Sequence, residues 1–195
     1  MEKELIDFIN ENEQLVNENR WEELYQKCET NLRGKLTDCL LSAELDVFED
    51  MNKIPDYAFS GSTVKEFNIP NSVTSIGWYA FHGCSSLESI KIPSSITSIS
   101  IHAFGRCERL TSIVIPDSVT EIGKWAFYGC DSLGTIILPR SITSIDEGAF
   151  TLCGDIEIRF DGTKEDWKKI YNSKAFENTY FTIYCTNGKI TRRKK

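Results

Sequence analysis

A 23-residue repeat is the feature that most constrains how this chain can fold. Prolines 70, 93, 116 and 139 each end an apolar stretch, and neighbouring prolines are 23 residues apart. The same step relates the pairs Ala80-Phe81, Ala103-Phe104, Ala126-Phe127 and Ala149-Phe150. A shortened copy, IPDYAFSGSTVKEFNIP, precedes them at residues 54–70. Because one such unit cannot bury its own apolar face, this period predicts a solenoid in which each repeat packs on its neighbours.

Each repeat contains one clear strand signal. The consensus is I-P-x-S-[VI]-T-x-I-x-x-x-A-F-x-x-C-x-x-L-x-x-I, and its end continues into LESIKIP, LTSIVIP and LGTIILP. In these segments apolar and outward residues alternate with a period of two, which is typical of a β-strand with one buried face. Proline then ends the strand because it cannot donate a ladder hydrogen bond.

The stretch IGWYAFHGC raises the question of a thiol active site, since a cysteine beside a histidine is one form of activated nucleophile. The cysteine recurs in every full repeat, however, whereas the histidine does not. We therefore predict an inward cysteine ladder of Cys84, Cys107, Cys130 and Cys153. The alternative is an enzyme that uses Cys84 with His82 or Cys107 with His102. A linear row cannot converge tetrahedrally on zinc, so we expect no metal site and no cofactor.

Charge divides the chain into three parts. Residues 1–53 carry a net charge of −8, residues 54–154 carry −3, and residues 155–195 carry +4, within a total of −7. We therefore predict a helical N-terminal cap at 1–53, repeats at 54–154, and a C-terminal capping module with a basic tail at 155–195. The overall negative charge opposes binding to nucleic acid or to an anionic membrane, because both require a basic face.

Both ends carry local signals for caps. Residues 3–48 show helical periodicity, which predicts two or three short helices, with Asn19 and Glu22 as an N-cap and its reciprocal acid. The acids of these helices either face solvent or form a docking surface for a basic partner. The C-terminal segment predicts strand, helix and strand, with a capping box of Thr163 and Asp166 at the helix start.

The repeats IPNSVTSIGWYAFHGCSSLESIKIP and IPDSVTEIGKWAFYGCDSLGTIILP resemble the BspA-like class of leucine-rich repeats. The resemblance covers residues 54–154 and implies an α+β fold. In detail, it implies a leucine-rich-repeat solenoid of about five turns of 22–23 residues with a parallel sheet on its concave side. It also implies a binding role, which in this family is often that of a secreted or surface-anchored protein.

Candidate binding residues occupy positions that the repeat leaves variable. Aromatic residues gather around the Ala-Phe corner, and an interface is one reason to place them there. Shielding of the backbone is a second reason, and a ligand site is a third. On the strand, the outward position becomes more apolar toward the C-terminus. The predicted partner-binding set comprises Trp78, Tyr79, His82, His102, Trp125 and Tyr128 at the corner, and Lys91, Val114 and Ile137 on the strand.

Together these patterns predict a non-enzymatic protein-binding module that scaffolds or occludes a partner protein. The N-terminal MEKELIDFINENEQ lacks the basic and apolar regions of a secretory signal, and no apolar run is long enough to span a membrane. We therefore expect a cytoplasmic protein with a protein partner. The alternative, which comes from the family resemblance, is a surface adhesin or ligand-binding domain.

Overall fold

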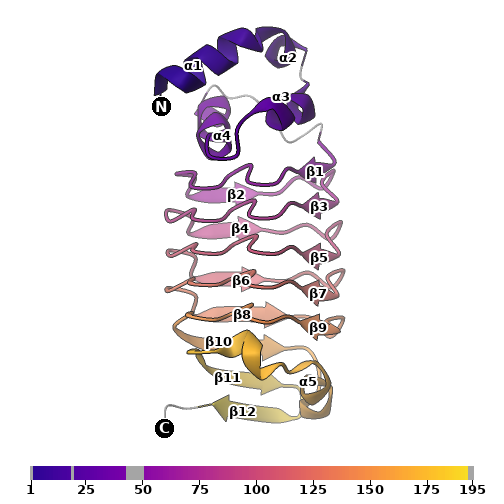
Figure 1. Cartoon of the computed structure of the whole chain (residues 1–195). Helices are drawn as coiled ribbons and strands as arrows, with labels where there is room; N and C mark the ends of the chain where they lie inside the picture. The colour runs from indigo at the N-terminus through magenta and orange to yellow at the C-terminus, as the bar shows by residue number, and fades with distance from the viewer. Residues whose placement is uncertain (1, 19, 43–50, 193–195) are drawn as a thin grey trace.

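The computed structural model describes residues 2–18, 20–42 and 51–192, and its repeats stack into a column (Figure 1). Each of the first five turns contains a short strand, a corner segment with the Ala-Phe pair, and a longer strand, and a sixth turn ends in a longer strand alone. The short strands are β1 (Lys53–Ile54), β3 (Ser75–Ile76), β5 (Ser98–Ile99), β7 (Glu121–Ile122) and β9 (Ser144–Ile145). The longer strands are β2 (Glu66–Asn68), β4 (Ser89–Lys91), β6 (Ser112–Val114), β8 (Thr135–Leu138), β10 (Asp155–Phe160) and β11 (Tyr180–Cys185). The predicted solenoid with a parallel sheet is confirmed.

The longer strands pair in parallel, offset by one repeat. Ile113 of β6 lies opposite Ile136 of β8, which lies opposite Ile158 of β10. β10 then pairs in parallel with β11, so the sheet continues beyond the repeats that the sequence identified. The last strand, β12 (Gly188–Arg192), pairs antiparallel with β11 in a hairpin that the sequence analysis did not predict.

A stack of phenylalanine rings fills the centre of the column. Phe59, Phe81, Phe104, Phe127, Phe150 and Phe176 are all fully buried. Neighbouring rings lie parallel, with centroids between 4.5 and 5.3 Å apart. Phe176 belongs to a 3-10 helix, Ser173–Phe176, and gives the C-terminal module its own place in the stack. Each inner ring therefore contacts a ring in the turn before it and a ring in the turn after it.

The four repeat cysteines are buried beside this stack. Each thiol donates a hydrogen bond to the Phe carbonyl of the preceding turn, as in Cys107 Sγ to Phe81 O at 3.2 Å and Cys130 Sγ to Phe104 O at 3.1 Å. Thr179 takes the same position in the last turn, where its hydroxyl donates to Phe150 O at 2.6 Å. The thiols therefore serve both as apolar filling and as donors between turns.

The N-terminal cap supplies hydrogen-bond donors to the first turn. Within the corners, N–H groups donate to the following turn, as in Phe81 N to Ala103 O at 2.8 Å. The first turn is therefore left with carbonyls that no earlier turn can satisfy. The Arg33 guanidinium donates to Asp56 O at 2.6 Å, and the Thr37 hydroxyl donates to Ala58 O. Both donors come from α4 (Arg33–Ser42).

The rest of this cap is helical as predicted, but it is divided differently. The described part holds four helices where two or three were expected: α1 (Glu2–Glu11), α2 (Glu13–Asn17), α3 (Trp21–Lys27) and α4. Helix α3 begins after Arg20, which makes no side-chain cap. The predicted cap residue Asn19 lies outside the described residues, as do residues 43–48 of the predicted helical region.

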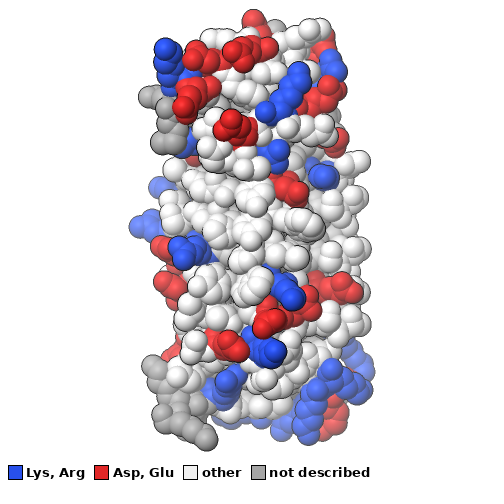
Figure 2. Space-filling model, viewed as in Figure 1, with Lys and Arg blue, Asp and Glu red and all other residues white. Residues whose placement is uncertain are grey.

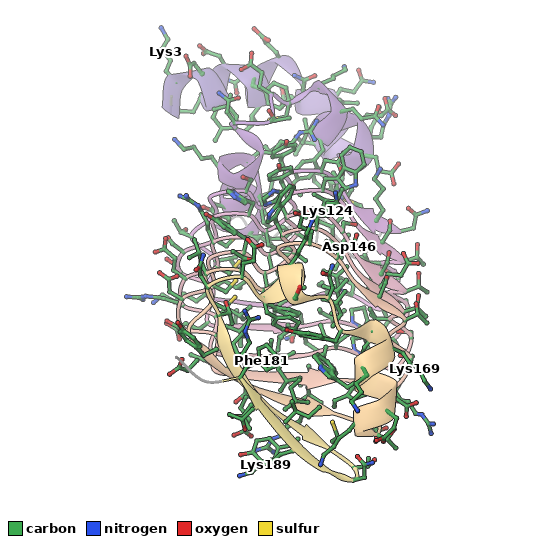
Figure 3. All side chains as sticks on the ribbon, turned by 60° about the horizontal axis from the view of Figure 1, so that its bottom comes forward. Lys3, Lys124, Asp146, Lys169, Phe181 and Lys189 are labelled. Carbon is green, nitrogen blue, oxygen red and sulfur yellow. The ribbon has the colours of Figure 1, made fainter. Side chains whose placement is uncertain are left out.

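The C-terminal module supplies acceptors to the last corner. Phe150 N donates to Ala175 O at 2.8 Å, and Gly148 N donates to Lys174 O at 2.9 Å. The predicted capping box is confirmed: Thr163 and Asp166 bond reciprocally at the start of α5 (Lys164–Ile170). Figure 3 turns this end forward and shows α5 with Lys169 beside the β11–β12 hairpin, which carries Phe181 and Lys189.

Candidate binding surfaces

Four aromatic side chains form a continuous stack at the corner of the column. Tyr57 and Tyr79 lie 5.0 Å apart with an interplanar angle of 3°. Tyr79 and His102 lie 4.5 Å apart, and His102 and Trp125 lie 5.1 Å apart. We call these four residues the corner stack. Sequence analysis missed Tyr57, although aligning the shortened first copy on Ala58-Phe59 would have placed it in this row.

The corner stack is built on a strained backbone. Its four residues have φ between 52° and 62°, the left-handed region that favours glycine. Each non-glycine residue there costs about 1–2 kcal/mol. The next turn has Gly148 at this position, and the indole of Trp125 covers it so closely that a Cβ on Gly148 would lie 2.1 Å from Trp125 Cδ1. Ring stacking therefore offsets the backbone cost in four turns, and a glycine ends the row.

Two further aromatic side chains contact this stack edge-on. His82 lies 5.3 Å from Tyr79 and 5.8 Å from His102, and Tyr128 lies 6.5 Å from His102. Burial lowers the pKa of His82, with a smaller contribution from the charge of Arg106. Burial also lowers the pKa of His102, with a smaller contribution from His82. Both imidazoles are therefore held neutral at pH 7 among uncharged rings.

The nearby thiols are not arranged as nucleophiles. Cys84 Sγ donates to Phe59 O at 2.9 Å, so its hydrogen bond goes to the backbone of the preceding turn. Burial raises the pKa of the Cys84 thiol to about 12, and the pKa of Cys107 is also well above its ordinary value. Because the thiolate is the nucleophilic form, these shifts oppose the catalytic hypothesis. Within the described ranges, no group of three or more His, Cys, Asp or Glu side chains could hold a metal ion.

The corner side of the column shows little charge at its centre. Figure 2 shows a largely uncharged patch over the middle of the column, with acidic and basic side chains above it, below it and at its left edge. Trp78, which precedes the corner stack in its turn, is 59% exposed, whereas Trp125 is 37% exposed. Tyr79, His82, His102 and Tyr128 are half-buried. Most of the predicted corner aromatics thus bury part of their surface against one another.

A second set of outward side chains follows the long sheet. The paired strands place Val114 beside Ile137, and Ile137 beside Arg159. Arg159 lies beside Tyr184, and Tyr184 beside Lys189. Lys91 has the equivalent position on β4, one repeat before Val114. We call this set the sheet row: Lys91, Val114, Ile137, Arg159, Tyr184 and Lys189.

The sheet row holds two exposed aliphatic side chains on adjacent strands. Val114 is 57% exposed and Ile137 is 40% exposed, and a cation stands on each side of the pair. Toward the C-terminal end, Tyr184 and Lys189 also line a hollow of about 570 Å³ over β10, β11 and β12. Sequence analysis missed Arg159, Tyr184 and Lys189, although the alternation in IEIRF could have extended the row by one strand.

The predicted binding residues are divided between two faces of the column. In Figure 1 the corner segments cross in front of the long strands. Phe104 of the corner and Ile113 of β6 are both buried. The core therefore separates the outward residues of the corner from the outward residues of β6. The structure therefore brings the corner residues together, and it places Lys91, Val114 and Ile137 on a separate surface.

Known proteins share this architecture. A structure of a leucine rich cell surface protein from Faecalibacterium prausnitzii is 32% identical over 62% of this chain, with a TM-score of 0.56. The leucine rich repeat protein of T. pallidum is 35% identical over 54% of the chain, with a TM-score of 0.51. This chain covers 32% of the first structure and 51% of the second. The pneumococcal vaccine antigen PcpA, at 21% identity and a TM-score of 0.55, shows the fold alone.

No curated protein matches the chain. No helix within the described ranges is long and apolar enough to cross a membrane. The family model for the BspA type leucine rich repeat region matches residues 52–183 in six copies, one more than the five turns that the sequence predicted. The additional copy agrees with the way β10, β11 and Phe176 continue the sheet and the ring stack. The chain therefore belongs to the BspA-type leucine-rich repeat family.

Proposed function

We propose that this chain is a non-enzymatic protein-binding module that holds its partner on the sheet row. The observation that carries the proposal is the exposed pair Val114 and Ile137, in register on adjacent strands between Lys91 and Arg159. A buried apolar centre with a charged rim is the usual composition of a protein interface. The corner stack, whose rings cover one another, has the structural role of stabilising a left-handed backbone.

The size of the sheet row sets the strength of the contact. Six positions on strands about 4.8 Å apart span about 24 Å. Such a row offers less than the roughly 800 Å² per partner of a standard interface. The proposed partner therefore either binds transiently or also contacts a cap.

The test is capture of a partner from native cells with matched variants. Val114→Asp with Ile137→Asp puts charge at the centre of the sheet row without touching the core, so the partner that the wild type captures should be lost. Trp125→Ala is the control on the other face and should retain that partner. Loss with Trp125→Ala and retention with the double variant would move the function to the corner face. Thermal unfolding of both variants checks that each remains folded.

The place of action remains part of the proposal. We propose that the chain scaffolds or occludes a partner inside the cell. The adhesin alternative is supported by the F. prausnitzii relative, which is described as a cell surface protein. Protease treatment of intact native cells separates the two. Degradation of the chain before lysis would favour the adhesin, and protection until lysis would favour the intracellular role.

A further inference from the structure

We infer that the partner segment on the sheet row is an acidic amphipathic α-helix that crosses the strands. This inference rests on the proposed function and adds the chemistry of the partner. Two independent observations carry it: the spacing of the row and the order of its side chains.

The spacing of the row favours a helix over an extended segment. Adjacent strands repeat about every 4.8 Å, so Lys91 and Arg159 stand about 14 Å apart. Three helical turns advance about 16 Å, which leaves a mismatch of about 2 Å that a small tilt can absorb. An extended segment presents one face every second residue, or about every 6.6 Å, and three such steps exceed the row by about 5 Å.

The order of side chains favours acids at both ends of the contact. Lys91 and Arg159 bracket the apolar Val114 and Ile137, and Lys189 adds a further cation beyond Tyr184. A matching helix carries an acid, then two apolar residues on successive turns, then a second acid, at i, i+4, i+7 and i+11. Carboxylates placed this way would meet Lys91 and Arg159 while the apolar residues cover the exposed pair.

Charges beside the row are compatible with this partner. The neighbouring outward row is uncharged next to the apolar pair, where it holds Ser112 and Thr135. Farther along, Glu157 accepts a hydrogen bond from Arg159 Nε at 2.9 Å. That contact uses one edge of the guanidinium and leaves its terminal nitrogens for a carboxylate of the partner, because a guanidinium has five N–H donors. The contact is therefore neutral at its centre, with Lys91 at one end and, at the other, the terminal nitrogens of an Arg159 that is ion-paired with Glu157.

The test uses a designed peptide of about 16 residues with an Ala-Gln background, glutamates at i and i+11, and leucines at i+4 and i+7. Binding is measured by fluorescence anisotropy with the full chain. We expect the wild type to bind it and Lys91→Glu with Arg159→Glu to weaken binding at least about tenfold. A peptide with lysines in place of the glutamates should show the reverse preference and bind the double variant better. Lys53→Glu on the short strand β1 with Lys124→Glu at the corner is the matched control, because neither residue belongs to the sheet row, and it should leave binding unchanged.

Several outcomes overturn the inference. The inference is wrong if the wild type shows no binding of the acidic peptide up to about 1 mM. It is also wrong if the wild type binds the acidic and the basic peptide equally. Stronger binding of a peptide with the same residues at i, i+2, i+4 and i+6 would identify an extended occupant. Self-association of the wild type that Val114→Asp abolishes would identify a second copy. If the peptide fails but Val114→Asp with Ile137→Asp still loses the native partner, the proposed function stands and the helix is wrong.

Discussion

At the residue scale, His102 tests whether stacking compensates for backbone strain. Its backbone φ is 53°, and its ring is stacked between those of Tyr79 and Trp125. Alanine would lose the stacking and keep the left-handed conformation, whereas glycine would lose the stacking but relieve the strain. We expect His102→Gly to be more stable than His102→Ala by about 1 kcal/mol in urea unfolding.

The same pair of substitutions at Glu108 provides the control, because this exposed residue is not among those with positive φ. There, alanine should be at least as stable as glycine. Equal stability of the two His102 variants would mean that the corner backbone relaxes away from the left-handed region when the ring is removed.

The cysteines should separate by exposure in an alkylation experiment. Cys39 is exposed and Cys185 is half-buried, whereas the other five are buried. Burial raises the pKa of Cys28 to about 11 and that of Cys84 to about 12, so little thiolate forms at pH 8. Mass spectrometry after iodoacetamide treatment should show rapid modification of Cys39, slower modification of Cys185, and the rest only in denaturant. Rapid modification of Cys107 in the folded chain would contradict the buried row.

Sequence patterning could predict which side chains face inward, but it could not predict the backbone at the corner. The 23-residue step placed Ala103 and Phe104 in the interior, where they are fully buried. Glycine is the sequence signal for the left-handed region. Among the five equivalent corner positions, only Gly148 is a glycine. The other four, Tyr57, Tyr79, His102 and Trp125, have the same left-handed backbone without that signal. The strain and its stacking compensation therefore required the structure.

At the scale of elements, the junction between α4 and the first turn depends on Thr37. Its buried hydroxyl donates to Ala58 O and also hydrogen-bonds the hydroxyl of Tyr25. Thr37→Val keeps the shape of the side chain but leaves buried polar groups without this partner. We expect a loss of about 2 kcal/mol in unfolding free energy, with the helical circular dichroism signal unchanged.

Thr74→Val is the matched control for this junction. Thr74 donates to Asn52 O at 3.0 Å but is exposed, so water can replace its hydroxyl. Its loss should stay within about 0.5 kcal/mol. Similar losses for both variants would show that the Thr37 contact is not specially important for attaching the cap.

The longer strand of each repeat and the Thr163–Asp166 capping box were predictable because each depends on a few local residues, whereas the short strands were not predicted. The β11–β12 hairpin was missed, although Asn187-Gly188 is a common hairpin turn signal. Its strong β pattern was assigned to one strand. The number of N-terminal helices was also wrong, since helix boundaries there are not marked by side-chain caps, as Asn12 and Arg20 illustrate.

At the scale of the whole molecule, the sequence could predict the stacking but not the assignment of faces. Corner and strand positions recur with the same period, so periodicity alone cannot say whether Trp125 and Val114 share a surface. That depends on how each turn closes around its core. The sixth copy was also hidden, because Thr179 takes the cysteine position and Phe176 follows a helical insertion. The replacement of cysteine by Thr179 and the inserted helix both change the motif but preserve the contacts.

The stack of phenylalanine rings predicts that the central turns unfold cooperatively. Phe104 contacts Phe81 and Phe127 at ring distances of 5.2 and 5.3 Å, so each turn is stabilised by both neighbours. Helix α1, by contrast, buries Leu5 and exposes Ile6. Native-state hydrogen exchange should therefore show central amides that open only with global unfolding and α1 amides that exchange much faster.

Phe104→Ala tests this cooperativity directly. It should cost about 3–5 kcal/mol and lower the protection of amides in all central turns, including distant Phe150, by a similar factor of about 140 to 3,700. The α1 amides should keep their exchange rates, because they already open locally. If protection falls only in the turns that contact residue 104, the column unfolds turn by turn, and the coupling between neighbouring turns is weaker than the ring stack implies.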